Sequence, residues 1–205
     1  MNRCVIRSCN HSCTLRAGLA RTVGALCTTL AVVVLGCPGA SAAAEACPGE
    51  AIQPTVSDAA NVETATLCLV NRVRTARRLR PLHANGSLLG VAASQVSAMI
   101  SWDYFSDVRP SGQTPFALVG VTRYPAHSAS FAVGQNIAWG TGSWASPRHI
   151  VAEWMASPAH RAVILTSKYR DAGVAVTAAV PDVVRSAGAP RTGATYAMEF
   201  GVRRR

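Results

Sequence analysis

The side chains that could carry acid–base or nucleophilic chemistry are few, and His160 is the main one to explain. His160 follows a Ser-Pro pair at the start of a predicted short helix. Together with the carboxylate of Asp107 and the hydroxyl of Ser97 or Ser106, it would supply the residue types of a Ser/His/Asp triad. Neither serine lies in the Gly-x-Ser-x-Gly turn that presents the nucleophile of one large hydrolase class. The residue types alone therefore do not indicate a serine hydrolase.

The other histidines have simpler interpretations. His149 and Glu153 are four residues apart in a helical pattern, so we expect them to pair on the surface of one helix. His83 and His127 lie in loop-like sequence, where we expect both to be solvated.

The first element that would position such side chains is a helix from Asn61 that ends before Pro81. Apolar residues recur there at three- and four-residue spacing, as on one face of a helix. Arg74, Arg77 and Arg78 cluster on another face. We expect that face to be solvated, with a patch for an anionic cell-surface polymer or lipid headgroup as the alternative.

Three further helices are predicted from their starting residues. Asn85-Gly86-Ser87 precedes a helix over 88–100. Ser146-Pro147 begins another, with serine as the N-cap and proline in the first turn. That helix ends at Ser157-Pro158, which begins a short fourth one.

The predicted strands come late in the chain, over 134–139, 173–179 and 195–202. The segment between the last two is rich in Gly, Pro and Ser, which predicts a hairpin loop or flap. Helices first and strands after indicate the α+β class rather than a βαβ repeat. The last three residues, Arg203–Arg205, are expected to form a frayed basic tail.

Length and composition are those of one folded domain. The chain has 205 residues, of which 49% are hydrophobic and 15% charged, and its formal net charge is +10. Only four Trp, four Tyr and four Phe are present. Because single-stranded nucleic acids bind on aromatic stacking platforms, we expect no nucleic-acid partner despite the positive charge.

The N-terminal 44 residues have the layout of a secretory signal. Residues 1–21 contain four arginines and no acid, residues 22–37 are apolar, and small residues follow. The apolar run is shorter than the roughly 20 residues that span a membrane. We therefore expect a signal peptide over 1–44 that is removed, with an N-terminal anchor helix or a buried helix as the alternative.

A second export signal overlaps the first. Val34-Leu35-Gly36-Cys37 resembles the lipobox of bacterial lipoproteins, in which the cysteine is lipidated and becomes the first mature residue. Under both readings the protein leaves the cytoplasm, and lipidation is the only membrane association we expect. Beyond the signal we expect an extended arm over 45–60, one domain over 61–202 and the basic tail.

Two cysteines remain after the signal. Of seven cysteines, five lie in the first 44 residues, which leaves Cys47 and Cys68. Two cysteines in an oxidising compartment predict one disulfide, which would tie the arm to the first helix. Two buried thiols are the alternative.

Four blocks of the sequence resemble the CAP superfamily, which comprises cysteine-rich secretory, antigen 5 and pathogenesis-related proteins, in its short bacterial secreted form. They lie between Leu67 and Gly201 in the expected order: CLVNRVRTARRLRPL, MISWDYFSDVRPSGQTPF, GQNIAWG, and EWMASPAHRAVIL followed by YRDAGVAV. The resemblance implies an α-β-α sandwich, in which helices cover both faces of a small antiparallel sheet.

The resemblance also implies a groove, whose residues in this chain depart from the family. The family lines it with a histidine on the second helix, a glutamate in a Gly-Glu-Asn-Ile strand start and a histidine in a Ser-Pro-Gly-His-Arg turn. Bacterial members often add a histidine after Phe-Ser. The matching residues here are Gln95, Gln135, His160 and Asp107, so only one family residue is kept. Asn136 lies beside them, and the His160 imidazole could instead hold the turn to the sheet through Gln135 or Asn136.

The two glutamines change what the groove can do. An amide brings neither a titratable proton near neutral pH nor an anionic ligand oxygen. We therefore expect no zinc site, no cofactor and impaired acid–base catalysis. The predicted function is a secreted domain that binds a small hydrophobic ligand or an envelope or protein partner without catalysis. A hydrolase that uses the groove around His160, and an interaction module lipidated at Cys37, are the alternatives.

Overall fold

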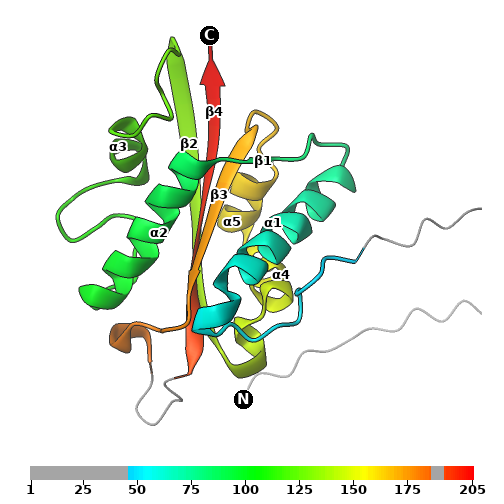
Figure 1. Cartoon of the computed structure of the whole chain (residues 1–205). Coiled ribbons are helices and arrows are strands. Elements are labelled where there is room, and N and C mark those ends of the chain that lie inside the picture. Colours follow the sequence, from blue (N-terminus) through cyan, green and yellow to red (C-terminus); the bar gives the residue numbers. More distant parts are fainter. Residues whose placement is uncertain (1–45, 186–191) are drawn as a thin grey trace, which may run out of the picture. The chain divides into compact units, whose positions relative to one another are not determined.

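A computed structural model of the chain describes residues 46–185 and 192–205 (Figure 1). The expected signal segment, its cleavage and the lipidation of Cys37 therefore lie outside the described residues, as does part of the predicted loop between the last two strands.

A four-stranded sheet forms the middle layer of the described chain, in the order β1-β3-β4-β2. The strands are β1 (His83–Ala84), β2 (Ser130–Thr141), β3 (Asp171–Thr177) and β4 (Gly193–Arg204). Strand β4 is the centre and pairs antiparallel with both β2 and β3. The short β1 runs parallel to β3 and covers it only at Asp171 and Ala172. The remainder of that edge of β3 has no neighbouring strand among the described residues.

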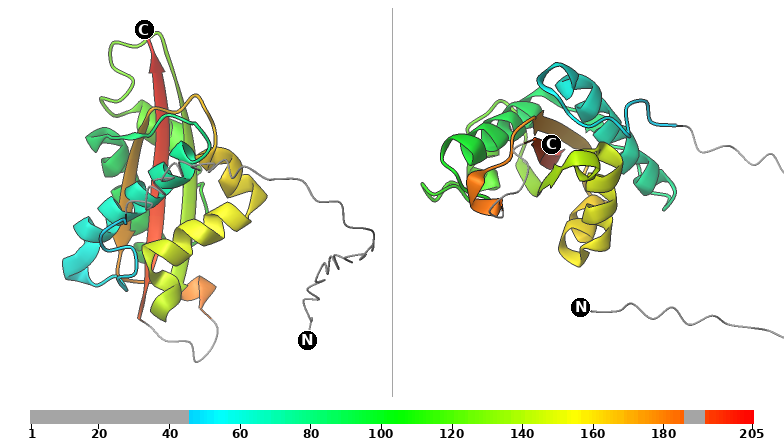
Figure 2. Two further views of the ribbon diagram at one scale, coloured as in Figure 1. Left: turned by 90° about the vertical axis from the view of Figure 1, so that its right-hand side faces the viewer. Right: turned by 90° about the horizontal axis from the view of Figure 1, so that it is seen from below.

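Helices lie on both faces of this sheet (Figures 1 and 2). They are α1 (Ala59–Thr75), α2 (Gly86–Ser101), α3 (Pro115–Gly120), α4 (Pro147–Ala156) and α5 (Pro158–Ile164). Helices α1, α4 and α5 share one hydrophobic core with the sheet, and α2 packs on the opposite face. The α-β-α sandwich and the α+β class predicted above are confirmed. Short 3-10 turns at Val56–Asp58, Gly142–Ala145 and Asp182–Val184 connect these elements.

Successive side chains of β4 point to opposite faces of the sheet, so they enter two different hydrophobic clusters, one on each face. Tyr196, Met198 and Phe200 enter the core with α1, α4 and α5, whereas Ala197 packs against α2. Because successive strand residues point to opposite faces, Glu199 lies on the α2 side of the sheet.

Local sequence explains where the helices start. The Asn85 side chain accepts hydrogen bonds from the backbone N–H groups of Ser87 and Leu88 and caps α2, which therefore begins at Gly86, two residues before the predicted start. Ser146-Pro147 begins α4 as predicted, but the serine hydroxyl contacts Ser143 O instead of capping the helix. Helix α3, capped by the Thr114 hydroxyl, was not predicted because its six residues are too few to show a period.

Arg74 is buried, and the prediction that it lies on a solvated face is wrong. Its side chain is completely inaccessible to solvent. The guanidinium donates hydrogen bonds to the carbonyls of Arg80, Ile164, Thr166 and Tyr169 at 3.0, 2.6, 3.1 and 3.3 Å. The segments that follow α1 and α5 converge on this one side chain, whereas Arg77 and Arg78 are exposed as expected.

The expected pairing of His149 with Glu153 is wrong, whereas His83 is exposed as expected. Nδ1 of His149 lies 2.8 Å from the Ser146 hydroxyl, and no ion pair joins His149 to Glu153 within the described residues. His83 is part of β1, because its N–H donates to the carbonyl of Arg170.

The basic tail is mostly strand. Arg203 and Arg204 pair with Phe131 and Ser130 across β2, so β4 runs two residues further than predicted. The Arg203 guanidinium lies 4.9 Å from the centre of the Tyr124 ring. A cation–π contact and the strand ladder hold residues that sequence alone assigned to a frayed end.

The predicted disulfide between Cys47 and Cys68 is confirmed, with its Cα atoms 5.7 Å apart. It ties the arm to α1. Glu50 adds ion pairs from the same arm to Arg72 on α1 and Arg148 on α4.

Removing this disulfide is expected to lower the free energy of unfolding by about 2 to 3 kcal/mol, since the bond closes a loop in the unfolded chain. The measurement is urea unfolding of the Cys47→Ala/Cys68→Ala double variant. Reduced wild-type protein is the control and should lose about the same amount. A loss in the variant alone would mean that repacking around Cys47 causes the effect.

Candidate functional site

Two of the predicted site residues, Gln135 and Asn136, lie on β2, and a buried carboxyl that was not predicted lies opposite Gln135. Gln135 on β2 is directly opposite Glu199 on β4 in the register of the sheet. The Gln135 amide donates a hydrogen bond to Oε1 of Glu199. The family resemblance implies a glutamate at position 135. This chain has glutamine there, and a glutamate lies opposite it on the neighbouring strand.

Glu199 is fully buried, and its second oxygen, Oε2, has no hydrogen-bond partner among the described residues. Burial raises the pKa of Glu199 to about 7, with the Asp107 carboxylate adding to the rise and the Gln135 amide opposing it. At neutral pH this carboxyl is thus close to half protonated and inaccessible to a substrate in bulk water.

Gln95 holds a loop in place. It is completely buried on α2, and its amide nitrogen donates to the carbonyls of Ser106 and Asp107 at 2.9 and 3.4 Å. Its amide oxygen accepts from Nε of Arg109 at 3.2 Å. Both ends of the amide are used, so Gln95 positions the segment that carries Asp107.

Asp107 is exposed and His160 is partly exposed. Burial of the Asp107 carboxyl raises its pKa, although the residue as a whole is exposed, and the nearby His160 opposes that rise. The Asn136 side chain donates to the backbone carbonyl of His160 at 3.1 Å, which holds the start of α5 against β2. The contact between strand and turn thus uses the peptide carbonyl rather than the imidazole.

The structure brings the groove residues into contact in pairs. Gln95 lies against the Asp107 backbone, Asp107 and His160 affect each other electrostatically, Asn136 binds His160, and Gln135 binds Glu199. The proposed serines are not part of this set. The Ser106 hydroxyl accepts from Val108 N–H, and no hydrogen bond in the described chain joins Ser97 or Ser106 to His160.

A metal would find few ligands in this groove. Within residues 46–185 and 192–205, no three His, Cys, Asp or Glu side chains come together in a metal-binding arrangement. His160 and Asp107 are one imidazole and one carboxylate, short of the three protein ligands that zinc usually has.

Sequence reasoning missed Glu199 and Arg109. Glu199 had a signal, because it is one acid within the otherwise apolar strand pattern Tyr196–Phe200. An acid on a buried strand needs a partner, and the register supplies Gln135. Arg109 had no signal, since its role depends on a loop that folds back onto α2.

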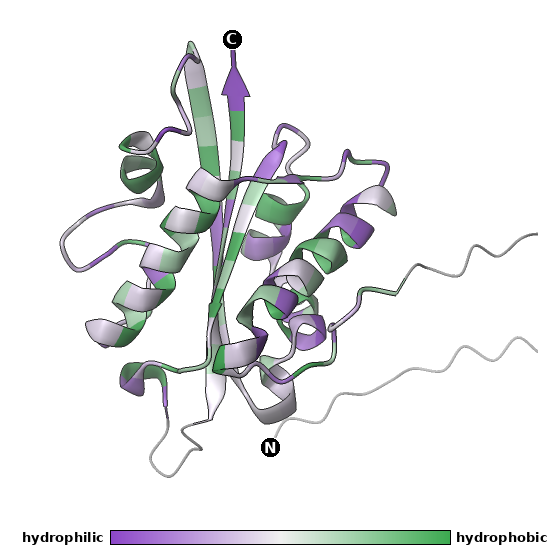
Figure 3. Cartoon of the chain, in the orientation of Figure 1, coloured by the Kyte–Doolittle hydropathy of each residue, from purple (hydrophilic) through white to green (hydrophobic). Residues whose placement is uncertain are grey.

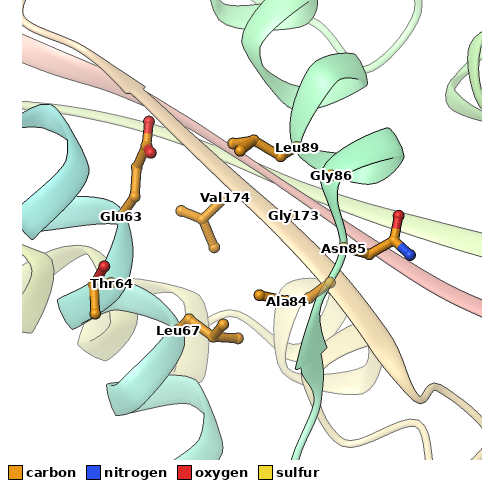
Figure 4. Close-up of a pocket in the computed structure, with 10 residues that line it drawn as sticks. Glu63, Thr64, Leu67, Ala84, Asn85, Gly86, Leu89, Gly173 and Val174 are labelled. Carbon is orange, nitrogen blue, oxygen red and sulfur yellow. The ribbon is translucent and has the colours of Figure 1, made fainter.

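A second candidate site lies at the open edge of β3, between α1 and α2 (Figure 4). The cavity has a volume of about 200 Å³, and its apolar walls include Leu67, Leu89 and Val174. Glu63 of α1 lies at its border and is its one charged lining residue among those described.

An adjoining cavity of about 320 Å³ shares Glu63 and continues past Ala175–Thr177. Glu63 Oε1 accepts a hydrogen bond from the Val176 N–H at 3.2 Å, on the edge that β1 leaves uncovered. Burial raises the pKa of Glu63, and the Val176 hydrogen bond opposes this. Glu63 therefore lines both cavities along β3, of which the first is mostly apolar and the second includes the hydroxyl groups of Ser97, Ser101 and Thr177.

The model of the cysteine-rich secretory protein family (CAP) matches residues 67–179, more than half of the chain. An extracellular protein containing a SCP domain from Bacillus anthracis is 20% identical, with a TM-score of 0.54, over 75% of this chain and 45% of that chain. An outer surface protein of Borrelia burgdorferi is 16% identical, with a TM-score of 0.53, over 67% of this chain and 90% of that one. A cysteine-rich secretory protein from Staphylococcus aureus is 21% identical, with a TM-score of 0.50, over 71% of this chain and 40% of that one.

These likenesses establish the fold. The chain spans less than half the length of the Bacillus and Staphylococcus structures. No curated protein matches it. None of the helices in the described residues is long and apolar enough to cross a membrane.

Proposed function

Since the chain belongs to the cysteine-rich secretory protein (CAP) family, we propose that it is an exported protein that binds an apolar, lipid-like ligand and catalyses no reaction. The ligand occupies the cavity between α1 and α2 at the edge of β3. The observation that carries this proposal is a difference between the two candidate sites. The residues around Asp107 and His160 lack an accessible acid–base pair, whereas the cavity beside β3 is open and mostly apolar.

The groove has lost its accessible acid–base pair. Gln95 and Gln135 are engaged in internal hydrogen bonds, and the nearby acid, Glu199, is buried. Asp107 and His160 are left without a hydrogen-bonded nucleophile in the described chain. General acid–base catalysis needs an acid and a base that the substrate can reach, and Gln95 and Gln135 supply neither.

The cavity beside β3 has the features of a binding site for a small apolar molecule. Ligand pockets are concave and mostly apolar, with a few polar groups that orient the ligand. Leu67, Leu89 and Val174 supply the apolar walls, and Leu89 is 39% exposed, so the cavity is open to solvent. The Glu63 carboxylate would repel an anionic headgroup, so the expected ligand has a neutral or cationic head.

A small molecule suits this edge better than an added peptide strand. Val174 and Val176 are only 5% and 8% exposed, because their side chains pack into the core that α1 shares with the sheet. The Glu63 side chain also occupies the Val176 N–H. A peptide strand would have to displace that side chain to reach the backbone.

Export is supported by three independent features. The first 44 residues have the layout of a secretory signal. The Cys47–Cys68 disulfide is typical of an oxidising compartment. The Bacillus relative is described as extracellular, and the Staphylococcus relative as secretory.

Filling the cavity is expected to abolish ligand binding. Ala84 lines it from β1 and is exposed, so Ala84→Phe places a ring in the cavity without disturbing the core. Calorimetric titration with dodecanol and dodecylamine, below their micelle-forming concentrations, should show affinity at least tenfold weaker for the variant. Dodecanoate should bind the wild type at least tenfold more weakly than dodecylamine, and Glu63→Gln should reduce that difference.

His83→Phe is the matched control, because His83 adjoins Ala84 on β1, is also exposed and does not line the cavity. Its affinities should equal those of the wild type. Failure of all three probes to bind the wild type, or equal losses in both phenylalanine variants, would contradict the proposed ligand site.

A further inference from the structure

Three arginines from distant parts of the chain line one cavity that is separate from both candidate sites. Arg170 precedes β3, whereas Arg203 and Arg205 come from the end of β4. The turn before β2 contributes His127. The cavity has a volume of about 330 Å³, and the hydrophilic end of β4 is visible in Figure 3.

The positive charge of this cavity is not neutralised by the protein. The ion pairs in the described residues involve Arg72, Arg148 and Arg185, so no carboxylate lies within ion-pair distance of the three cavity arginines. Asp171 is the one acid among the lining residues. Among the lining side chains, three therefore carry a positive charge and one carries a negative charge.

Asp171 already has a partner. Its Oδ2 accepts a hydrogen bond from the Tyr124 hydroxyl at 2.8 Å. Burial and the Asp171 charge raise the pKa of Tyr124, so the phenol stays protonated and keeps donating. The carboxylate is thus held by tyrosine rather than by the arginines beside it.

Two of the arginines are held in place before any ligand arrives. The Arg203 guanidinium stacks on the Tyr124 ring. Nη1 of Arg170 donates to the carbonyls of Ser167, Lys168 and Tyr169 at 2.6, 3.1 and 2.8 Å, while Nε and Nη2 have no hydrogen bond within the described residues. Fixed side chains with unused donors lose little conformational entropy when they bind an anion.

We propose that this cavity binds a phosphate monoester, an anion with a charge of about −1.5 to −2 at neutral pH and three terminal oxygens that several arginine side chains can share. Arginine forks suit phosphate oxygens geometrically, and several arginines can share one phosphate. A carboxylate has only two oxygens and one charge, so fewer of the arginine side chains can bind it. Two kinds of molecule carry a phosphate monoester group: a soluble phosphate ester and an anionic lipid that has this group as its headgroup.

The test compares two neighbouring arginines on β4. Arg203 lines the cavity, whereas Arg204 points to the opposite side of the strand and does not line it. Arg203→Met and Arg204→Met remove the same charge from exposed positions. Calorimetric titration with glycerol phosphate and sedimentation with phosphatidylcholine vesicles, with and without phosphatidic acid, distinguish the soluble from the lipid source. Thermal unfolding of each variant establishes that it is folded.

We expect Arg203→Met to weaken binding roughly tenfold or more and Arg204→Met less than twofold. Asp171→Asn, which removes the competing charge but keeps an acceptor for Tyr124, should strengthen binding several-fold. If glycerol phosphate or the phosphatidic acid vesicles bind with these variant effects, the site is supported, and the probe that binds shows whether the ligand is a soluble ester or a lipid. Equal losses in the two methionine variants, acetate binding as tightly as glycerol phosphate, or no binding of either source would overturn it.

Discussion

Replacing Arg74 with methionine is expected to lower the free energy of unfolding by about 3 to 5 kcal/mol. Four backbone carbonyls, from the segments after α1 and α5, accept hydrogen bonds from this one buried guanidinium. Methionine fills a similar volume but leaves those carbonyls without donors in the protein interior. The measurement is urea unfolding followed by circular dichroism.

Arg77→Met is the matched control, because Arg77 lies just beyond the same helix, is exposed and donates only to the nearby Val73 carbonyl. It should change stability by no more than about 0.5 kcal/mol. Arg74→Lys should fall between the two, since an ammonium keeps the charge but lacks the planar fork. Equal stability of the Arg74→Met and Arg77→Met proteins would show that the carbonyls find other donors.

Glu199→Gln is expected to stabilise the protein at alkaline pH and leave it unchanged in acid. The pKa of Glu199 is about 7 in the folded protein, against 4.5 for an ordinary glutamate. Below pH 4.5 the carboxyl is protonated in both states and folding is unaffected. As the pH rises from 4.5 through 7, the unfolded chain releases this proton more readily, so folding stability is lost.

The difference of about 2.5 pKa units corresponds to about 3 kcal/mol above pH 7. The stability difference between Glu199→Gln and wild type should therefore grow from near zero at pH 4.5 to about that value at pH 8. Urea unfolding at several pH values measures it. Glu153→Gln, at an exposed position on α4, is the control. A difference for Glu199→Gln that does not vary with pH would rule out a buried, proton-retaining carboxyl.

The burial of Glu199 also limits its chemical role. A carboxyl that exchanges its proton near neutral pH can act as an acid or base only where a substrate reaches it. Glu199 is covered by α2 on its side of the sheet, and Gly173 beside it leaves no room for a Cβ, since Leu89 N would lie 2.0 Å away. Glu199 is therefore an acid in the protein interior that binds Gln135, and a substrate in solution does not reach it.

The sequence was sufficient for features that depend on neighbouring residues. The starts of α2, α4 and α5 follow from an Asn-Gly turn and two Ser-Pro pairs, because caps and proline act within one turn. The Cys47–Cys68 disulfide followed from the cysteine count beyond the signal. The sandwich followed from four blocks that resemble one family.

Other features required the tertiary structure because they join residues far apart in the chain. Strand periodicity says which face a side chain takes but not which residue lies opposite, so the Gln135–Glu199 pair needed the β2–β4 register. A helical pattern containing arginines predicts a solvated face, but Arg74 is buried because carbonyls from residues 80 to 169 converge on it. Arg203 lies in a strand because β2 provides a ladder for it, and no local signal in three successive arginines indicates that pairing.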